Sequence, residues 1–154
     1  MSERQLIVFE LNNGQYGAGS SDVIEIQKNS SIEIVQNMPL FIEGVTEFRG
    51  GTVPVASLNK RFNMGEGGAG HKGKKVIIIA KVDDMVIGFE VNKIIGINSF
   101  PEENTEPTPE LLKDAGLRFV SGIVKSEKND KLIPVIDFSK VFSETELETL
   151  KKIL

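Results

Sequence analysis

Residues 65–75 form the part of this sequence that most nearly matches a chemical motif. Residues 65–70 satisfy G-x-G-x-x-G, the pattern that holds a dinucleotide pyrophosphate between a β-strand and the N-terminus of a helix. Residues 68–74 approach a phosphate-binding P-loop, but Lys75 stands where a Ser or Thr must hold magnesium. An apolar, strand-like run follows at 76–79, where both motifs require a helix. We therefore interpret the Gly-rich segment 63–74 as a flexible linker and keep a nucleotide-dependent enzyme as an alternative.

Other side chains suited to catalysis are scarce. The chain has no Cys, which excludes thiolate zinc sites, iron–sulfur clusters and a Cys nucleophile. Its single His, His71, falls inside the linker, so a Ser-His-Asp triad or a multi-His metal site would depend on that one residue. The paired carboxylates Asp83-Asp84 stand in an expected turn. We predict no catalytic residue, no metal site and no cofactor.

Composition and charge narrow the functional class further. The 154 residues carry 18 basic and 22 acidic side chains, with a net charge of −4, whereas nucleic-acid-binding proteins usually present a basic surface. No apolar run approaches the ~18 residues that cross a bilayer, and the first five residues are polar, unlike a signal peptide. We expect one domain over 1–154 in the cytoplasm, with no nucleic-acid partner and no direct membrane insertion.

Short apolar runs separated by turn residues predict β-hairpins. The first joins 6–11 to 15–19 through Asn12-Asn13-Gly14, where Asn and Gly tolerate positive φ. Three further hairpins are expected, pairing 45–48 with 52–55, 75–82 with 85–91, and 119–125 with 131–136. Short strands at this spacing are typical of sandwiches and barrels, so we expect a mainly β fold.

Helical signals are few. Ser143 and Glu146 have the spacing of a capping box, and Leu147 and Leu150 follow at helical spacing. These residues predict a short C-terminal helix. Residues 57–62 predict one helical turn, and 109–112 predict another that begins with Pro.

The sequence also contains an internal repeat. Leu11, Gly17 and the run 23–26 recur at one constant offset as Val82, Gly88 and 94–97. Further on, Gly44-Val45 and Val53-Pro54-Val55 recur as Gly122-Ile123 and Ile133-Pro134-Val135. We interpret this as a duplicated β-barrel unit, and since each half alone would have a thin core, the halves should pack on each other.

Residues 38–62 are the most informative segment. They read as a strand, a tight turn led by Arg49-Gly50, and a second strand containing Pro54, which suggests an edge or a bulge. Arg49 at the end of the apolar strand has two interpretations that the residues alone leave open. It forms a surface ion pair, or it presents its fork of donors to a carboxylate or to backbone carbonyls of a partner.

This segment resembles the CheW family of chemotaxis coupling proteins. The family pattern is roughly F-I-x-G-V-x-N-L-R-G-x-x-[IV]-P-V-x-D-L-x-x-x-F, which residues 41–62 follow closely. Tyr16-Gly17 and residues 23–26 fit its upstream Tyr-Gly and Val-x-Glu-Ile elements, and residues 86–91 fit its second-half strand. The resemblance spans nearly the whole chain.

The resemblance implies two intertwined five-stranded SH3-like β-barrels with a short C-terminal helix. It implies a non-enzymatic adaptor that bridges the cytoplasmic tips of transmembrane chemoreceptors and the regulatory domain of the histidine kinase CheA. An apolar groove between the barrels would take the receptor tip. The positions implied to contact receptor or kinase are Val23, Glu25, Gly44, Arg49, Gly50 and Gly88, with Val76 and Ile77 as secondary candidates.

Two departures from the pattern support a second hypothesis. Glu47 replaces the family Asn and adds a charge beside Arg49, and Ser57 replaces the family Asp. These differences would suit a CheW-like scaffold for a different chemosensory-type kinase pathway, such as one that controls surface motility or development.

Overall fold

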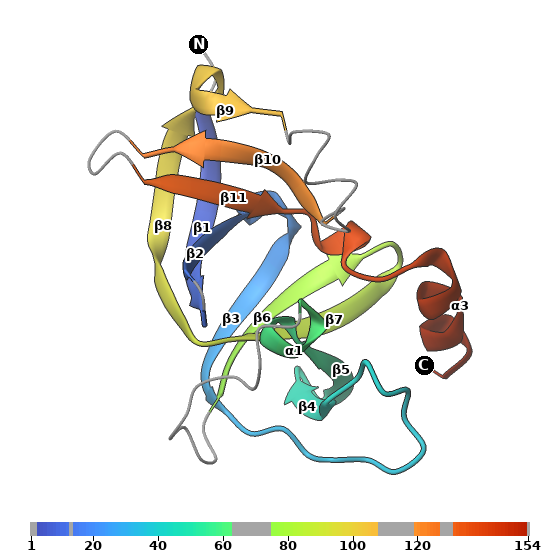
Figure 1. Cartoon of the computed structure of the whole chain (residues 1–154). Coiled ribbons are helices and arrows are strands. Elements are labelled where there is room, and N and C mark those ends of the chain that lie inside the picture. Colours follow the sequence, from blue (N-terminus) through green and yellow to red (C-terminus); the bar gives the residue numbers. More distant parts are fainter. Residues whose placement is uncertain (1–2, 13, 63–74, 108–118, 127–130, 154) are drawn as a thin grey trace.

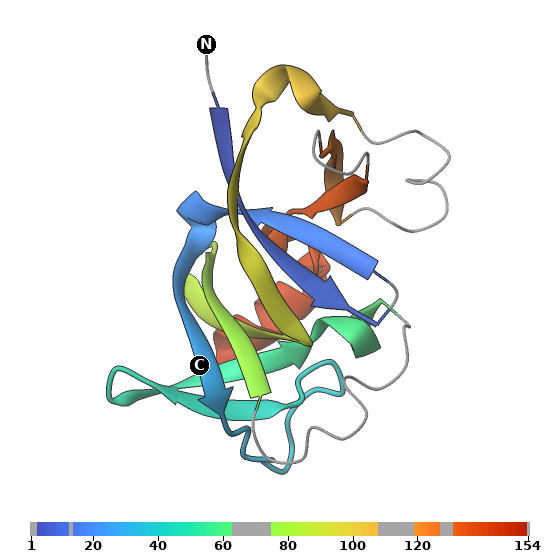
Figure 2. The ribbon, with the colours of Figure 1, turned by 90° about the vertical axis from the view of Figure 1, so that its left-hand side faces the viewer.

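Two curled β-sheets make up most of the structure, a computed structural model that describes residues 3–12, 14–62, 75–107, 119–126 and 131–153. In spatial order the first sheet contains β8 (Lys93–Pro101), β1 (Glu3–Leu11), β2 (Gly14–Gly19), β11 (Leu132–Ile136), β10 (Val120–Lys125) and the short β9 (Thr105–Glu106). The second contains β3 (Val23–Ser30), β6 (Lys75–Val82), β7 (Met85–Val91), β5 (Gly51–Ser57) and β4 (Gly44–Phe48). Each sheet curls into a barrel, and we call them the first and the second barrel in the same order. Figure 1 shows the first barrel above the second, and Figure 2 shows the same arrangement after a quarter turn.

Short helical elements lie between the strands or follow the last one. Their bounds are η1 (Ser20–Asp22), α1 (Leu58–Arg61), η2 (Glu102–Asn104), η3 (Phe138–Lys140) and α3 (Glu144–Ile153). None of the helices in the described residues is long and apolar enough to cross a membrane. The predicted linker 63–74, including His71, and the predicted helical turn at 109–112 lie outside the described residues.

All the predicted hairpins are confirmed, as β1–β2, β4–β5, β6–β7 and β10–β11. The strands β3 and β8 were not predicted. In β3 the pairing with β6 shifts between Val23 and Glu25, which leaves Ile24 bulged out. In β8 the same shift against β1 leaves Ile95 bulged out. A bulge interrupts the alternation of apolar and polar residues, so neither strand has the period-two pattern that marks a strand in a sequence.

The two barrels are built from the same unit, which confirms the internal repeat. β1 to β3 correspond to β6 to β8, and β4 and β5 correspond to β10 and β11, so that both sheets have the same strand order apart from β9. Each sheet, however, draws strands from both halves of the chain. β5 runs parallel to β7, with Val55 opposite Gly88, and β11 runs parallel to β2, with Val135 opposite Gly17. The barrels are therefore intertwined, as expected.

The buried apolar side chains of the described residues form three clusters. Leu6 and Val8 of β1 point into the first barrel, while Phe9 and Leu11 of the same strand join a large core shared by both sheets. The interior of the second barrel is smaller and consists of Val53, Val55, Ile77 and Ile79. Because strand side chains alternate between faces, each central strand serves its own barrel and the shared core at once.

A ring of three asparagines joins elements that are distant in the sequence. The Asn59 side chain on α1 accepts a hydrogen bond from the backbone N–H of Asn12 (2.8 Å) and donates one to Asn92 Oδ1 (2.5 Å). Asn92 in turn donates to Asn12 Oδ1 (2.9 Å). Asn59 is almost fully buried, and a buried amide left without partners would destabilise the fold. The ring therefore ties the β1–β2 turn, α1 and the β7–β8 junction together.

The C-terminal helix α3 begins with the predicted capping box. Ser143 Oγ accepts from the Glu146 N–H (3.1 Å), and Glu146 Oε1 accepts from the Ser143 N–H (2.8 Å). Leu147 and Leu150 are buried in the shared core. The sequence thus predicted both the start of this helix and the face that it buries.

Candidate functional site

The candidate contact residues all lie in the second barrel, on β3, on β6, on β7 and on the β4–β5 hairpin. β3 and β4 stand at opposite ends of the sheet order, but the barrel closes and brings them together. The residues after β3 pair with β4 through two backbone hydrogen bonds of 2.8 Å between Glu33 and Val45. The Thr46 hydroxyl also donates to the Ser31 carbonyl (3.0 Å). Closure is what places a residue of β3 beside the end of the β4–β5 hairpin.

Arg49 and Gly50 form the two-residue turn of that hairpin. Both have positive φ, +50° and +78°, as a type I′ turn requires. The Arg49 guanidinium lies over the Phe48 ring, 4.8 Å from its centroid, and both turn residues are exposed. The fork of donors on Arg49 is thus held above the surface on an aromatic support, free to pair with a carboxylate or with carbonyl groups.

Glu25 is exposed on β3, and Gln27 connects it with the hairpin. The Gln27 side-chain amide donates to the Glu47 carbonyl (3.0 Å) and makes a longer contact of 3.4 Å with the Glu25 carboxylate. Val23 lies on the same strand, half-buried against the shared core. We call the exposed residues Glu25, Glu47, Arg49 and Gly50, with Val23, the β3–turn surface.

The structure gives Gly44 and Gly88 positions inside the fold. A Cβ on Gly44 would lie 2.4 Å from the Glu33 carbonyl oxygen, and one on Gly88 would lie 2.8 Å from Ile77 Cγ2. Both distances are shorter than a carbon atom tolerates. Gly44 therefore allows β4 to meet residues 31–33, which we call the closing segment, and Gly88 allows the second barrel to pack. A substitution at either position perturbs the fold as well as any contact.

Of the secondary candidates, Ile77 is fully buried in the interior of the second barrel. Val76 is partly buried against the shared core. The sequence-predicted positions thus divide into an exposed group on β3 and the turn, and a buried group that supports it. Sequence reasoning missed Gln27, although its place two residues after Glu25 puts both side chains on the same face of a strand.

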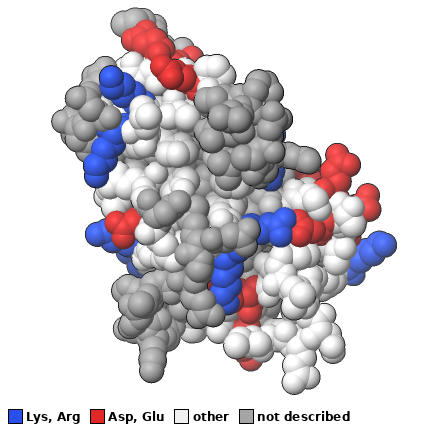
Figure 3. All heavy atoms as spheres, viewed as in Figure 1, with Lys and Arg blue, Asp and Glu red and all other residues white. Residues whose placement is uncertain are grey.

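The charges on the surface are mixed. Figure 3 shows one face of the molecule, on which small groups of Lys and Arg side chains alternate with groups of Asp and Glu side chains over the described residues. The β3–turn surface likewise carries both signs of charge, with Glu25 and Glu47 acidic and Arg49 basic. We therefore expect a partner to be recognised by pairing of individual opposite charges, and less by the overall attraction of a surface that carries one sign of charge.

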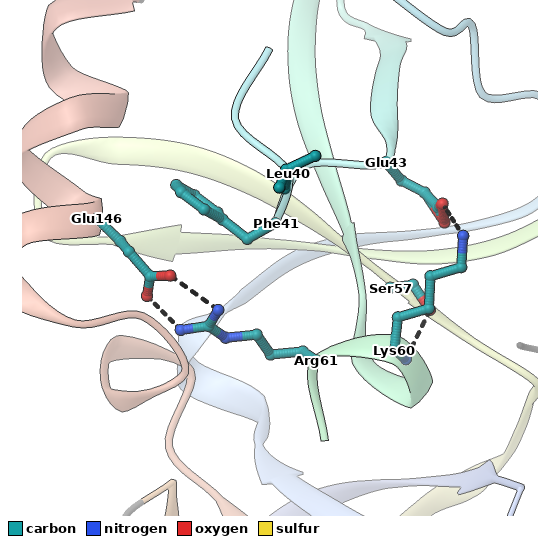
Figure 4. A pocket seen from close by; sticks show the side chains of 7 residues that line it. All are labelled: Leu40, Phe41, Glu43, Ser57, Lys60, Arg61 and Glu146. Carbon is teal, nitrogen blue, oxygen red and sulfur yellow. Dashed lines mark hydrogen bonds and ion pairs between the residues drawn. The ribbon is translucent and has the colours of Figure 1, made fainter. Parts of the chain in front are cut away.

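A hollow lies between α1, the segment before β4 and the C-terminal helix (Figure 4). It encloses about 460 Å³ and is lined by Leu40, Phe41, Glu43, Ser57, Lys60, Arg61 and Glu146. Figure 4 shows its charged side chains in two pairs, Lys60 with Glu43 at 2.5 Å and Arg61 with Glu146. The two pairs hold α1 against neighbouring elements, and this hollow was not predicted from the sequence.

The Arg61–Glu146 pair is partly buried. Arg61 Nη1 donates to Glu146 Oε2 (2.8 Å), and Arg61 Nε donates to the Val141 carbonyl (3.0 Å). Burial alone would raise the pKa of Glu146, but hydrogen bonds from Ser143 and Arg61, together with the Arg61 charge, outweigh it and lower the pKa. Glu146 is thereby held ionised at the start of α3, where a negative charge also suits the helix dipole.

Ser57, which replaces the family Asp, has a structural role. Its hydroxyl accepts a hydrogen bond from the Lys60 N–H (3.3 Å) at the N-cap of α1, and the residue is buried. Ser and Asp are both favoured N-cap residues. The replacement therefore preserves the cap, whereas the other departure, Glu47, changes the exposed surface beside Arg49.

Comparison with known proteins shows similarity to CheW proteins over most of the chain. Residues 5–146 match the CheW-like domain family. The chain is 26% identical over 148 residues to a chemotaxis protein CheW of Treponema pallidum, covering 95% of this chain and 86% of that protein. It is 30% identical over 146 residues to a probable chemotaxis protein CheW of Rhizobium etli, covering 95% and 92%.

Among solved structures, the fold is similar to the crystal structure of the scaffolding protein TtCheW from Thermoanaerobacter tengcongensis. The TM-score is 0.79 and the sequence identity is 32%, with 92% of this chain and 94% of the other covered. The family match over residues 5–146 and the relative of 30% identity agree, and the chain belongs to the CheW-like domain family.

Proposed function

We propose that this protein is a non-enzymatic scaffold of chemotaxis signalling that couples chemoreceptors to the histidine kinase CheA. The observation that carries the proposal is the match to the CheW-like domain over residues 5–146. It is supported by the names of the similar proteins, which are chemotaxis proteins CheW and a scaffolding protein. In this proposal the protein works in the cytoplasm and is recruited to receptor arrays at the membrane.

The β3–turn surface is the proposed contact for the kinase regulatory domain or the receptor tip. Arg49 supplies donors for a carboxylate or for carbonyl groups of the partner, and Glu25 supplies an acceptor. Gly44, Gly88 and Ile77 support this surface from inside the barrel. An apolar groove between the barrels for a helical receptor tip stays a prediction from the family resemblance.

A binding experiment tests the proposal directly. The full chain is mixed with a cognate CheA regulatory domain and, separately, with a receptor signalling fragment, and capture of each is measured. We expect both to bind, and we expect Arg49→Ala to weaken at least one of them while the melting temperature is unchanged. Lys152→Ala, which removes an exposed charge from α3, is the matched control and should bind normally. A well-folded protein that captures neither partner would contradict the proposed function.

A scaffold for a different chemosensory-type kinase pathway is the second candidate, and Glu47 is the observation that favours it. Glu47 is exposed and two residues from Arg49 on the proposed contact surface, so its charge would change which partner fits. Glu47→Asn restores the family residue. If the second candidate is right, the unaltered protein prefers the regulatory domain of the other pathway's kinase in a competition assay, and Glu47→Asn shifts that preference toward the chemotaxis kinase.

A further inference from the structure

Gln27 is a side chain to which the family pattern gives no role. It lies on β3 and is partly buried. Its carbonyl oxygen accepts a hydrogen bond from the Ser30 hydroxyl (2.6 Å), which fixes the orientation of the amide. Its amino group then donates to the Glu47 carbonyl (3.0 Å) and reaches the Glu25 carboxylate (3.4 Å). One oriented amide thus spans from β3 to the last residues before the Arg49 turn.

We propose that Gln27 is a positioning residue of the β3–turn surface, which holds the Arg49 turn at a fixed place relative to Glu25. The inference rests on the proposed function, because it assigns Gln27 a role in binding the same partner. Gln27 acts through Arg49 and Glu25 and is not itself required to touch the partner.

The order of contacts along the hairpin supports this role. Between the closing segment and β4, the described hydrogen bonds join Glu33 to Val45 and Ser31 to Thr46, both near the base of the hairpin. The Gln27 bond to the Glu47 carbonyl lies nearer to the turn than either of these. Without it, the last residues of the hairpin keep their bonds to β5 but are no longer held to β3. The end of the hairpin would then move more freely in the unbound protein. Because ordering a mobile segment during binding costs free energy, this motion would weaken partner binding.

The first barrel provides an internal comparison. At the place in β8 that corresponds to Gln27 stands Asn98, whose side chain is shorter by one methylene. Within the described residues Asn98 makes no hydrogen bond to β10, the strand that corresponds to β4. The same barrel unit therefore closes without such a bridge. The bridge is not a requirement of the fold, and it is present in the barrel that carries the candidate contact residues.

The solvent exposure of the Gln27 contacts predicts that a substitution of Gln27 weakens partner binding without unfolding the protein. The Gln27 contacts to Glu25 and Glu47 are exposed to solvent, so water can replace the lost donors at little cost. Gln27→Met keeps the length of the side chain and removes its donors and acceptor. Gln27→Glu keeps an acceptor for Ser30, removes the donors and places a second negative charge beside Glu25.

Two measurements on the full chain test the inference. The first is the ¹⁵N order parameter of backbone amides 46–51, which we expect to fall in Gln27→Met and Gln27→Glu with no change in melting temperature. The second is the Kd for a cognate CheA regulatory domain, which should rise about fivefold in Gln27→Met. Gln36→Met, at an exposed glutamine before β4, is the matched control and should change neither quantity.

A double-mutant cycle with Arg49→Ala decides whether Gln27 acts through the turn. We expect Gln27→Met to raise the Kd by less than about twofold when Arg49 is already alanine. An equal effect in both backgrounds, or unchanged order of the hairpin, would overturn the inference. If the unaltered protein binds the regulatory domain and Gln27→Met binds it with the same Kd, the inference about Gln27 is overturned and the proposed function stands. If the unaltered protein does not bind at all, the proposed function itself is overturned.

Discussion

Arg49 occupies a backbone conformation that suits other residues better. The left-handed region crowds the Cβ of an L-residue, and Asn or Gly fills the first position of a type I′ turn in most hairpins. Here an arginine has φ +50°, and its guanidinium is exposed on the Phe48 ring. Strain of this kind is retained at positions where the side chain serves a purpose other than the turn. The conformation of Arg49 is therefore independent support for a binding role.

Arg49→Asn separates what the turn requires of this residue from what partner binding requires of it. Asparagine keeps the turn and relieves the strain, so we expect the free energy of unfolding to rise by about 0.5 kcal/mol. The same change removes the guanidinium and should abolish the Arg49 contribution to partner binding. Urea denaturation and a pull-down on the same sample measure both effects. A variant that is less stable than the unaltered protein, or that binds equally well, would contradict this account.

Gly44 and Gly122 form a matched pair at the closing points of the two barrels. A Cβ on Gly44 would lie 2.4 Å from the Glu33 carbonyl oxygen, while one on Gly122 would lie 3.0 Å from the Glu106 carbonyl oxygen. We expect Gly44→Ala to lower the free energy of unfolding by about 2 kcal/mol and Gly122→Ala to lower it by less, because backbone must move in the first case. Chemical denaturation of both variants checks the order, and the reverse order would refute the steric explanation.

At the scale of single residues, the sequence predicts only part of the candidate site. The motif around Arg49 was visible because its residues are adjacent in the sequence. The burial of Gly44 and Gly88 was not visible, since a glycine in a motif gives no sign of whether a partner or the chain's own atoms lie against it. Gln27 was missed because its bond to Glu47 depends on barrel closure, which joins residues far apart in the sequence.

At the scale of elements, the C-terminal helix shows how local and distant interactions combine. Its capping box and its buried leucines could be predicted from spacing alone. Its attachment to α1 through Arg61 and Glu146 could not, because 85 positions separate the two residues. The same limit applies to β3 and β8, whose bulges hide the alternation of the strand and whose partners come from the other half of the chain.

The Arg61–Glu146 pair predicts a pH dependence of stability. The pKa of Glu146 is lower in the folded protein than in the unfolded chain, whose glutamates have a pKa of about 4.3. Its contribution is therefore present above that value and is lost as the pH falls through the lower folded pKa. Glu146→Gln should cost about 1 kcal/mol of unfolding free energy at pH 7 and much less at pH 3.

Urea denaturation at the two pH values measures this difference. Glu148→Gln, on the exposed side of the same helix, is the control and should have a small effect at both. An Arg61–Glu146 contribution that is as large at pH 3 as at pH 7 would show that the charge is not what attaches the helix.

At the scale of the whole molecule, strand exchange between the halves is the dominant feature. The second barrel takes β3, β4 and β5 from before residue 63 and β6 and β7 from after residue 74, and the first barrel has the converse origin. The repeat in the sequence predicted two similar units. It could not predict the exchange, because a repeat shows that two segments are alike and not which segment each one pairs with.

Strand exchange makes a prediction about fragments. A chain of residues 1–62 and a chain of residues 75–154 should each be unfolded alone, since neither contains a complete barrel. Mixed in equal amounts, they should assemble and recover the circular dichroism of the intact protein. A cooperative thermal transition in either fragment alone would contradict the view that the two barrels fold as one unit.

The exchanged strands also have a consequence for ancestry. A single copy of the repeated unit would leave its β-sheet incomplete, and two identical copies could complete both sheets by trading strands across a two-fold axis. Fusing such copies end to end would convert a subunit interface into the shared core that contains Phe89 and Phe138. After fusion each copy is free to diverge in sequence, and neither can be deleted. The present difference between Gln27 and Asn98 is the kind of specialisation that such a history permits.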